Sequence, residues 1–203
     1  MHWTNRRRMR KIIGIAGLIG SGKDTVANHL INNHNFRSVK FADKLKDGVA
    51  AIFEWPRDLL EGDTDESRKW RETPDKFWSK ELGFDVTPRY VLQKFGTEVR
   101  DGFHIHTWTI LLKKTIIDNP NTNYVIADVR FTHEDKLIKE LGGRMWRVAR
   151  GPDPDWFTGY RRNGTEPTNV HPSEWKWANI DFNNTIKNDG TIADLHKQIN
   201  DLL

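Results

Sequence analysis

The stretch IIGIAGLIGSGKDTVANHL, residues 12–30, decides the fold of this chain. It opens with an apolar run, and residues 17–23 then have the glycine–four residues–glycine–lysine spacing of a phosphate-binding loop. After the lysine, apolar residues recur with helical spacing. The pattern predicts a buried strand over residues 12–16, a phosphate loop, and a helix over residues 23–33.

Each part of this loop has a chemical reason. The glycines let the backbone curl so that successive N–H groups point at one phosphate. The helix contributes the positive end of its dipole, and Lys23 bridges terminal phosphate oxygens. Asp24 stands where such loops normally carry Ser or Thr, and Thr25 comes one residue late. A tight turn without a ligand is the alternative, but the flanking strand and helix favour a nucleotide site.

Length and composition limit the class of protein. A chain of 203 residues fits one domain, and without a membrane-spanning run or a signal peptide we expect a soluble cytoplasmic protein. The absence of cysteine excludes disulfides and thiolate metal sites. A net charge of +4 favours an anionic partner. Much of this charge lies in residues 1–11, which we expect to be a disordered leader, with a nucleic-acid-binding arm as the alternative.

Strand and helix patterns alternate along the chain. Short apolar runs predict strands at residues 12–16, 36–41, 124–128, 144–148 and within 182–190. Helical patterns occupy residues 23–33, 42–53, 87–96, 108–117, 134–141 and 192–202. This alternation predicts an α/β fold, a parallel sheet of the P-loop type covered by helices on both faces. Two polar stretches, residues 61–86 and 151–172, interrupt the pattern and are candidate functional insertions.

Charged residues near the predicted strand ends extend the site. Asp128 follows a hydrophobic strand, where P-loop enzymes carry the acid that holds the water shell of magnesium, and Arg130 shares that crevice. A helix cap is the alternative role for Asp128. Arginines in or beside the polar stretches fit a clamp around a second phosphate group, with a solvated face as the alternative. They are Arg68, Arg71, Arg147, Arg150, Arg161 and Arg162.

Taken together, these motifs resemble a known family, the deoxynucleoside monophosphate kinases of tailed bacteriophages, in which Asp also follows the loop lysine. Seven blocks occur in the family's order: SGKDT (21–25), FADKLKD (41–47), GDTDESRKWRE (62–72), LQKFGTEVR (92–100), DVRFTHE (128–134), HPSE (171–174) and IKNDGTIADL (186–195). The resemblance implies one P-loop kinase domain over residues 12–203, with a monophosphate-binding region at about 42–100 and a lid at about 150–178. It also implies ATP and Mg2+ as cofactors, a deoxynucleoside 5′-monophosphate as substrate, and possible homodimers.

The resemblance and the chemistry of phosphoryl transfer together assign roles to the candidate residues. The donor phosphates are assigned to Gly17, Gly20, Ser21, Gly22 and Lys23, and the metal, through water, to Asp24, Thr25 and Asp128. The acceptor phosphate is assigned to Lys46, Arg68, Arg71 and Arg130, and closure over the transferred group to Arg150 and Arg147. Adenine is assigned to Asn188, Asp189 and Gly190, and the acceptor base and sugar to Gln93, Gly96, Thr97 and Trp108. A helix cap, a turn or, for Trp108, a place in the core is the alternative for each.

Two other functions stay open at this point. A P-loop kinase of another small phosphate acceptor, such as dephospho-coenzyme A, shares the strand plan and the N-x-G pattern, but usually keeps Ser or Thr after the lysine. A nucleic-acid-binding ATPase fits the basic charge and the nine tryptophans, but the chain lacks a helicase-type acid pair after a strand. We therefore expect no membrane partner and no stable nucleic-acid complex. The HIH motif at residues 104–106 is more typical of a structural role than of metal binding.

Overall fold

Two compact units make up the chain in a computed structural model that describes residues 10–168, 170 and 172–203. Unit 1 holds the residues up to Lys40 together with Lys113–Leu203, and unit 2 holds Phe41–Leu112. Most of the basic leader and His171 of the HPSE block lie outside the described residues. The expectations for those residues therefore stay predictions.

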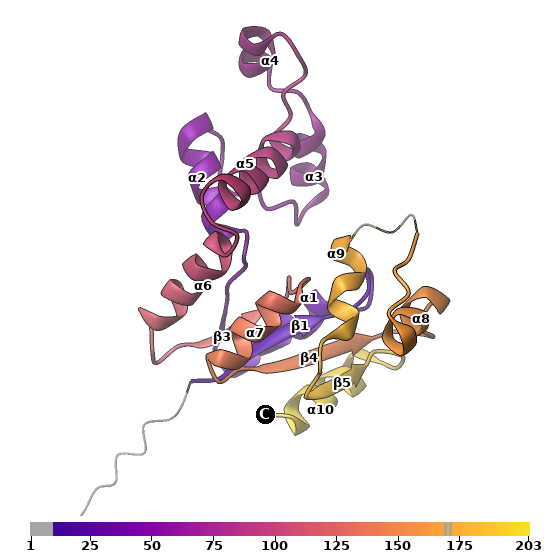
Figure 1. Cartoon of the computed structure of the whole chain (residues 1–203). Coiled ribbons are helices and arrows are strands. Elements are labelled where there is room, and N and C mark those ends of the chain that lie inside the picture. The colour runs from indigo at the N-terminus through magenta and orange to yellow at the C-terminus, as the bar shows by residue number, and fades with distance from the viewer. Residues whose placement is uncertain (1–9, 169, 171) are drawn as a thin grey trace, which may run out of the picture. The chain divides into compact units, whose positions relative to one another are not determined.

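Unit 1 is built on a parallel sheet with the strand order β2-β3-β1-β4-β5 (Figure 1). The strands are β1 (Ile12–Ala16), β2 (Phe36–Ser38), β3 (Asn123–Ile126), β4 (Arg144–Ala149) and β5 (Asn184–Lys187). Each lies where the sequence predicts a strand, although β2 stops at Ser38 and β3 stops two residues before Asp128. All five residues of β1 are buried, as expected of a central strand in a parallel sheet. The predicted α/β fold is confirmed.

Helices cover both faces of this sheet. Ile13 and Ile15 of β1 belong to a core that includes residues of α1 and α10. Successive side chains of a strand point to opposite faces, and a methyl group on Gly14 would lie 2.7 Å from Ile138 of α7. The helices of unit 1 are α1 (Lys23–His34), α7 (Thr132–Glu140), α8 (Asp155–Asn163), α9 (Pro172–Trp175), the 3-10 helix η1 (Lys176–Asn179) and α10 (Ile192–Asp201).

Unit 2 consists of helices around a core of its own. They are α2 (Asp43–Phe53), α3 (Asp65–Glu72), α4 (Lys76–Leu82), α5 (Pro88–Gly102) and the first part of α6 (Thr107–Ile117), which crosses the boundary between the units. The core centres on Val49, Trp55 and Leu60, and the indole nitrogen of Trp55 donates a hydrogen bond to Asp75 at 2.9 Å. Tryptophans are thus buried in both units: Trp55 in unit 2, and Trp146, Trp175 and Trp177 in unit 1.

Three expectations about helices are wrong. Residues 61–86 contain α3 and α4, and residues 151–172 contain α8, so neither stretch is irregular throughout. The starts of α3 and α4 are polar caps, in which Thr64 and Asp75 accept hydrogen bonds from backbone N–H groups, and apolar periodicity does not detect such caps. α5 continues past Gly96 to Gly102, since a single glycine within a helix costs only about 1 kcal/mol.

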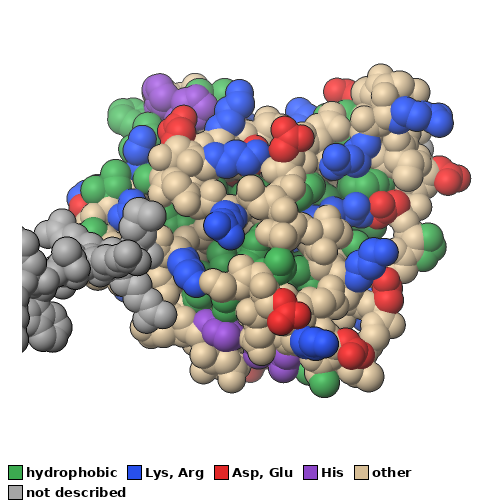
Figure 2. All heavy atoms as spheres, turned by 90° about the horizontal axis from the view of Figure 1, so that it is seen from below, with side chains coloured by type: hydrophobic (Ala, Val, Ile, Leu, Met, Phe, Trp, Pro, Cys, Tyr) green, Lys and Arg blue, Asp and Glu red, His purple; other side chains and the backbone are tan. Residues whose placement is uncertain are grey.

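Surface charge is dispersed on the face that Figure 2 shows. Lys and Arg side chains are spread there around hydrophobic side chains, with acidic groups among them. The positive charges on this face thus do not form a continuous stripe. Within the described part of the chain, no helix is both long enough and apolar enough to cross a membrane.

The core of unit 2 generates a stability test. Leu60 is 0% exposed, whereas Ile52, which the helical periodicity of α2 places on the same face as Val49, is 54% exposed. Leu60→Ala should lower the free energy of unfolding by about 2–5 kcal/mol, because it leaves a cavity. Ile52→Ala, the matched control, should change it by less than about 0.5 kcal/mol. Urea unfolding followed by tryptophan fluorescence measures both, and equal losses would contradict this core.

Candidate functional site

The phosphate loop is confined by the strands beside it. Gly22, the N-cap of α1, has a φ of +99°, and a methyl group there would lie 2.3 Å from Nδ2 of Asn188. A methyl group on Gly17 would lie 2.4 Å from the carbonyl oxygen of Val148. The hydroxyl of Ser21 is buried and has no hydrogen-bond partner among the described residues. Only glycine fits the backbone at Gly17 and Gly22, which fixes the shape of the loop.

Lys23 is folded back onto this loop. Its Nζ donates hydrogen bonds to the carbonyl oxygens of Gly17 and Leu18, each at 2.9 Å. Burial lowers the pKa of the Lys23 ammonium, and the charge of Arg130 lowers it further, while Asp24 and Glu174 act in the opposite direction. Two neutral carbonyls are weaker partners for an ammonium than phosphate oxygens are. The lysine therefore has an electrostatic reason to turn toward an anion.

A pocket of about 550 Å³ opens beside the loop, within the size range of small-molecule sites. It brings together residues that the sequence predicts separately: Gly20, Gly22, Lys23, Asp24, Thr25, Arg150, Asn188 and Gly190, with Thr191 and Ile192. The side-chain amide of Asn188 donates to the carbonyl oxygen of Ser21 at 2.9 Å. Asp189 accepts from the backbone N–H of Gly151 at 2.6 Å. These two hydrogen bonds join the loops that follow β1, β4 and β5.

The segment after β3 leads to Glu134, a buried carboxyl group that was not among the site residues predicted from the sequence. Glu134 is buried, and its Oε2 accepts hydrogen bonds from the backbone N–H groups of Arg130 at 2.6 Å and Phe131 at 3.0 Å. Burial raises the pKa of Glu134 to about 8, and the charge of half-buried Asp128 acts in the same direction. A Glu three positions after a helix cap is a recognisable sequence signal, and here it fixes the turn that carries Arg130.

Arg130 is engaged by an acid from the region predicted as the lid. Its Nη1 lies 2.7 Å from Oε1 of Glu174 on α9. Both charges act on the pKa of Lys23, so this ion pair belongs to the electrostatic surroundings of the phosphate loop. Glu174 is a second group that the sequence did not single out as a site residue.

The predicted metal residues are only partly brought together. Asp24 and Thr25 line the pocket, while Asp128 is not among the residues that line it. Among the described residues, no three or more His, Cys, Asp or Glu side chains are grouped to hold a metal ion. A metal at this site would therefore depend on phosphate oxygens and water for most of its ligands.

The late arginines have different environments. Arg150 is exposed and lines the pocket. Arg147 lies within β4, where its guanidinium pairs with Asp153 and packs over the ring of Phe157, 4.3 Å from the ring centroid. Arg161 donates to the carbonyl oxygen of Ala178 at 2.5 Å. Only Arg150 of this group thus lines the pocket beside the phosphate loop.

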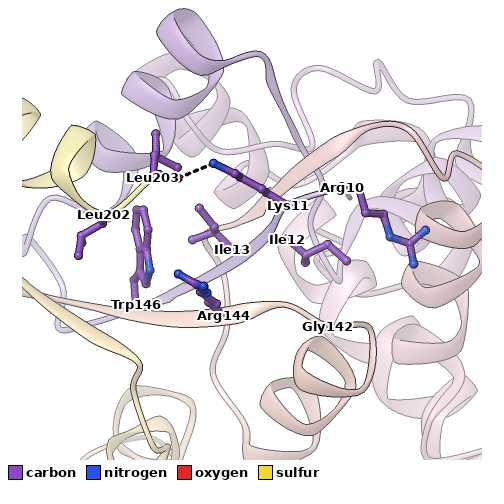
Figure 3. Close-up of a pocket in the computed structure, with 9 residues that line it drawn as sticks. All are labelled: Arg10, Lys11, Ile12, Ile13, Gly142, Arg144, Trp146, Leu202 and Leu203. Atoms are coloured by element: carbon purple, nitrogen blue, oxygen red, sulfur yellow. Dashed lines mark hydrogen bonds between the residues drawn. The ribbon is translucent and has the colours of Figure 1, made fainter. Parts of the chain in front are cut away.

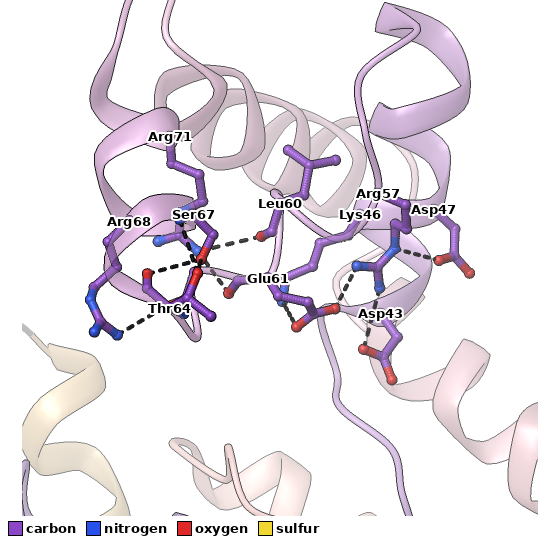
Figure 4. A network of polar contacts seen from close by, with 11 residues as sticks. Asp43, Lys46, Asp47, Arg57, Leu60, Glu61, Thr64, Ser67, Arg68 and Arg71 are labelled. Atoms are coloured by element: carbon purple, nitrogen blue, oxygen red, sulfur yellow. Dashed lines mark hydrogen bonds and ion pairs between the residues drawn. The ribbon is translucent and has the colours of Figure 1, made fainter.

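In unit 2, four cationic side chains surround the segment of residues 60–64 (Figure 4). Three are predicted acceptor residues. Nζ of Lys46 lies 2.7 Å from Oε2 of Glu61, Arg71 donates to the Glu61 carbonyl at 3.0 Å, and Arg68 pairs with Asp65 at 2.6 Å. The fourth, Arg57, was not among the residues predicted from the sequence. It lies 2.5 Å from Oε1 of Glu61.

The residues predicted to hold the acceptor base lie on and beside α5. Gln93 and Thr97 are exposed and four positions apart, so they share one face of the helix. The indole nitrogen of Trp108 donates to the carbonyl oxygen of Gly96 at 3.0 Å, and the ring is half-buried. Their role in binding stays a prediction.

A second cavity, of about 320 Å³, lies at the amino ends of β1 and β4, away from the phosphate loop (Figure 3). It is bounded by Ile12 and Ile13 at the start of β1, Arg144 at the start of β4, and Trp146. Nζ of Lys11 donates to the carbonyl oxygen of Leu203 at 2.6 Å across its rim. Ligands of open parallel sheets bind at the carboxyl ends of strands, which favours the pocket at the phosphate loop as the nucleotide site.

Two proteins whose sequences are similar to that of this chain are kinases. A protein of Acanthamoeba polyphaga mimivirus, named as a deoxynucleotide monophosphate kinase, is 32% identical over 201 residues, which cover 93% of each chain. A deoxynucleoside-5′-monophosphate kinase of Escherichia phage T5 is 39% identical over 56 residues, 27% of this chain and 22% of that protein. No family model matches the chain.

Solved structures are similar at a lower level. The dephospho-CoA kinase from Campylobacter jejuni is 17% identical, with 95% of each chain covered and a TM-score of 0.44. An APS kinase of Mycobacterium tuberculosis is 10% identical, with 96% of each chain covered and a TM-score of 0.42. At these scores they add nothing to what the two sequence relatives indicate.

The buried Glu134 predicts a dependence of stability on pH. Its pKa of about 8 in the folded protein lies above its ordinary value of 4.5, so between these pH values the folded state binds more protons than the unfolded state. The free energy of unfolding should therefore fall as pH rises through this window, by up to about 1.4 kcal/mol per pH unit. Glu134→Gln should flatten that slope in urea unfolding at pH 5, 6, 7 and 8. An unchanged slope in the variant would refute this pKa.

Proposed function

Because the chain belongs to the family of deoxynucleotide monophosphate kinases, we propose that it transfers a phosphoryl group from ATP to a deoxynucleoside 5′-monophosphate. The chain is a nucleoside monophosphate kinase. ATP as the phosphate donor and a deoxynucleotide as the acceptor are what we propose. The observation that carries it is the single pocket in which the phosphate loop, Arg150 and the loop after β5 meet.

The donor site fits a chain of phosphates. The loop from Gly17 to Lys23 ends at the N-terminus of a 12-residue helix, where backbone N–H groups and the helix dipole favour an anion. The buried hydroxyl of Ser21 would gain an acceptor, and Lys23 would exchange two carbonyl partners for phosphate oxygens. Asn188, Asp189 and Gly190, in the loop after β5, would then contact adenine.

The acid residues near the loop fit a metal bound through water. When bound, Mg2+ would screen the negative charge of the phosphates. Asp24 and Thr25 at the start of α1, with Asp128 after β3, would orient its water ligands through carboxylate and hydroxyl oxygens.

For the acceptor, unit 2 offers a cluster of cations. Lys46, Arg68 and Arg71 lie around one segment of the chain and would pair with the monophosphate. The acceptor-phosphate role predicted for Arg130 of unit 1 stays a prediction. Gln93, Gly96, Thr97 and Trp108 would contact the base and sugar. The acceptor oxygen is already anionic at neutral pH, so the chain needs no strong general base. Its contribution is orientation and charge stabilisation. Arg150, an exposed side chain that lines the pocket, would bind the transferred group.

The proposal is tested by a coupled assay with ATP and each ribo- and deoxynucleoside monophosphate. We expect turnover with at least one deoxynucleotide, and Lys23→Ala should reduce kcat by about 100- to 1000-fold, because it removes a charge that stabilises the transition state. Lys197→Ala, an exposed lysine of α10, is the matched control and should retain activity. If no deoxynucleoside monophosphate is phosphorylated, or if folded Lys23→Ala remains active, the proposal fails.

Asp24 has a separate test. An anion beside the phosphates repels the bare nucleotide, and a cation between them reverses this cost. Asp24→Asn should therefore raise the Mg2+ concentration that gives half-maximal turnover, while metal-free ATP binding stays equal or becomes tighter. A magnesium titration of Asp24→Asn beside Thr25→Val separates the two residues. If only Thr25→Val shifts the curve, Asp24 serves the helix as an N-terminal acid.

A further inference from the structure

Three polar atoms converge between the C-terminal parts of α1 and α10. Nε2 of His29 lies 2.9 Å from Oδ1 of Asn200, and Nε2 of His34 lies 2.8 Å from the same oxygen. The two imidazole nitrogens are themselves 3.3 Å apart. None of these three residues lines the pocket beside the phosphate loop.

The spacing of these atoms matches the ligand shell of a metal ion. Around a tetrahedral zinc with Zn–N bonds of 2.0–2.1 Å, ligand atoms are about 3.3 Å apart, and neighbouring ligands of an octahedral ion are about 3.0 Å apart. The two imidazole nitrogens are 3.3 Å apart, the tetrahedral value, and the two N···O separations of 2.8 and 2.9 Å lie just below the octahedral value. Two imidazole N–H groups donating to one amide oxygen would explain two of the separations, but not the close approach of the two nitrogens to each other.

We propose that His29, His34 and Asn200 form a binding site for a divalent transition metal of the Zn2+ class. Imidazole nitrogen is a ligand for zinc, cobalt, nickel and copper, whereas magnesium prefers an all-oxygen shell. The site is therefore distinct from the magnesium site proposed beside the phosphate loop. Only two of its ligands are histidines, so water completes the coordination.

One histidine of the proposed site is buried, while the other two ligand residues are accessible to solvent. His29 is only 8% exposed, and its ring stacks on His196 with centroids 3.9 Å apart, which fixes its orientation. Its Nδ1 has no hydrogen-bond partner among the described residues. His34 is half-buried and Asn200 is exposed, so an ion and its waters reach the three ligand atoms from solvent.

The position of the site gives it a structural effect. α1 begins at Lys23 in the phosphate loop, and α10 follows Gly190 and Thr191, which line the same pocket. An ion at the far ends of these helices would cross-link the two elements that frame the nucleotide pocket. Binding to the folded state alone would also stabilise the protein.

The test is a titration of the metal-free full-length chain with CoCl2 and ZnCl2, without nucleotide, so that it does not depend on kinase activity. Because the chain has no cysteine, visible absorption bands of bound Co2+ report nitrogen and oxygen ligands only. We expect one Co2+ per chain, displaced by Zn2+, and an increase in Tm of about 5–10 °C at a hundredfold excess over Kd. His34→Gln and Asn200→Ala, both at accessible positions, should weaken binding by about tenfold or more.

Two controls fix the location. His196→Phe keeps an aromatic ring against His29 and should retain the Co2+ bands. His106→Gln alters the other histidine pair, His104 and His106, whose rings lie 5.6 Å apart in unit 2, and it should also retain them. Unchanged affinity in folded His34→Gln and Asn200→Ala, or loss of the bands in His106→Gln, would overturn the proposal.

Discussion

The close approach of Asn188 to the phosphate loop is the constraint on which the site depends. The amide of Asn188 donates to the Ser21 carbonyl across 167 residues of sequence, and the same amide occupies the space that a side chain on Gly22 would need. The contact exists only when β4 pairs with β1 and β5 pairs with β4 in the observed register, with Ala16 beside Arg147 and Ala149 beside Lys187. A shift of one residue in either pairing would turn the strand's side chains to the opposite face and break the pocket.

Unit 2 has a different physical basis. Its helices share an aromatic core, and its charged residues form a network in which Arg57 and Lys46 are held by Glu61. Both cations are thus neutralised within the unit, which lowers the cost of keeping them together. A phosphate group would compete with Glu61 for them, so affinity for an anion here depends on how readily that carboxylate is displaced.

Sequence alone predicts the parts of this protein whose signals are local. The phosphate loop, the order of strands and helices and the Asn188 segment are short patterns that the fold preserves. The ion pair of Arg130 with Glu174 could not be predicted, because its partners are 44 residues apart and meet only after the fold forms. Helices α3, α4 and α8 were missed for another reason: polar residues cap their starts or fill their exposed faces, so apolar periodicity is weak there. Arg147 was predicted to close over the transferred group, and in the structure it lies within β4 and pairs with Asp153, a partner that its residue type alone does not indicate.

The strand order also constrains how the chain folds during synthesis. β1 and β2 are not neighbours in the sheet; β3 lies between them, and it ends at Ile126. The first two strands therefore have no partner of their own sheet until the ribosome has made more than half of the chain. Unit 2, whose core residues all lie within Phe41–Leu112, can form that core during this interval. Until β3 is synthesised, the apolar β1, which leads into the phosphate loop, can contact other molecules in the cell. The solubility of the nascent chain therefore depends on the length of this interval.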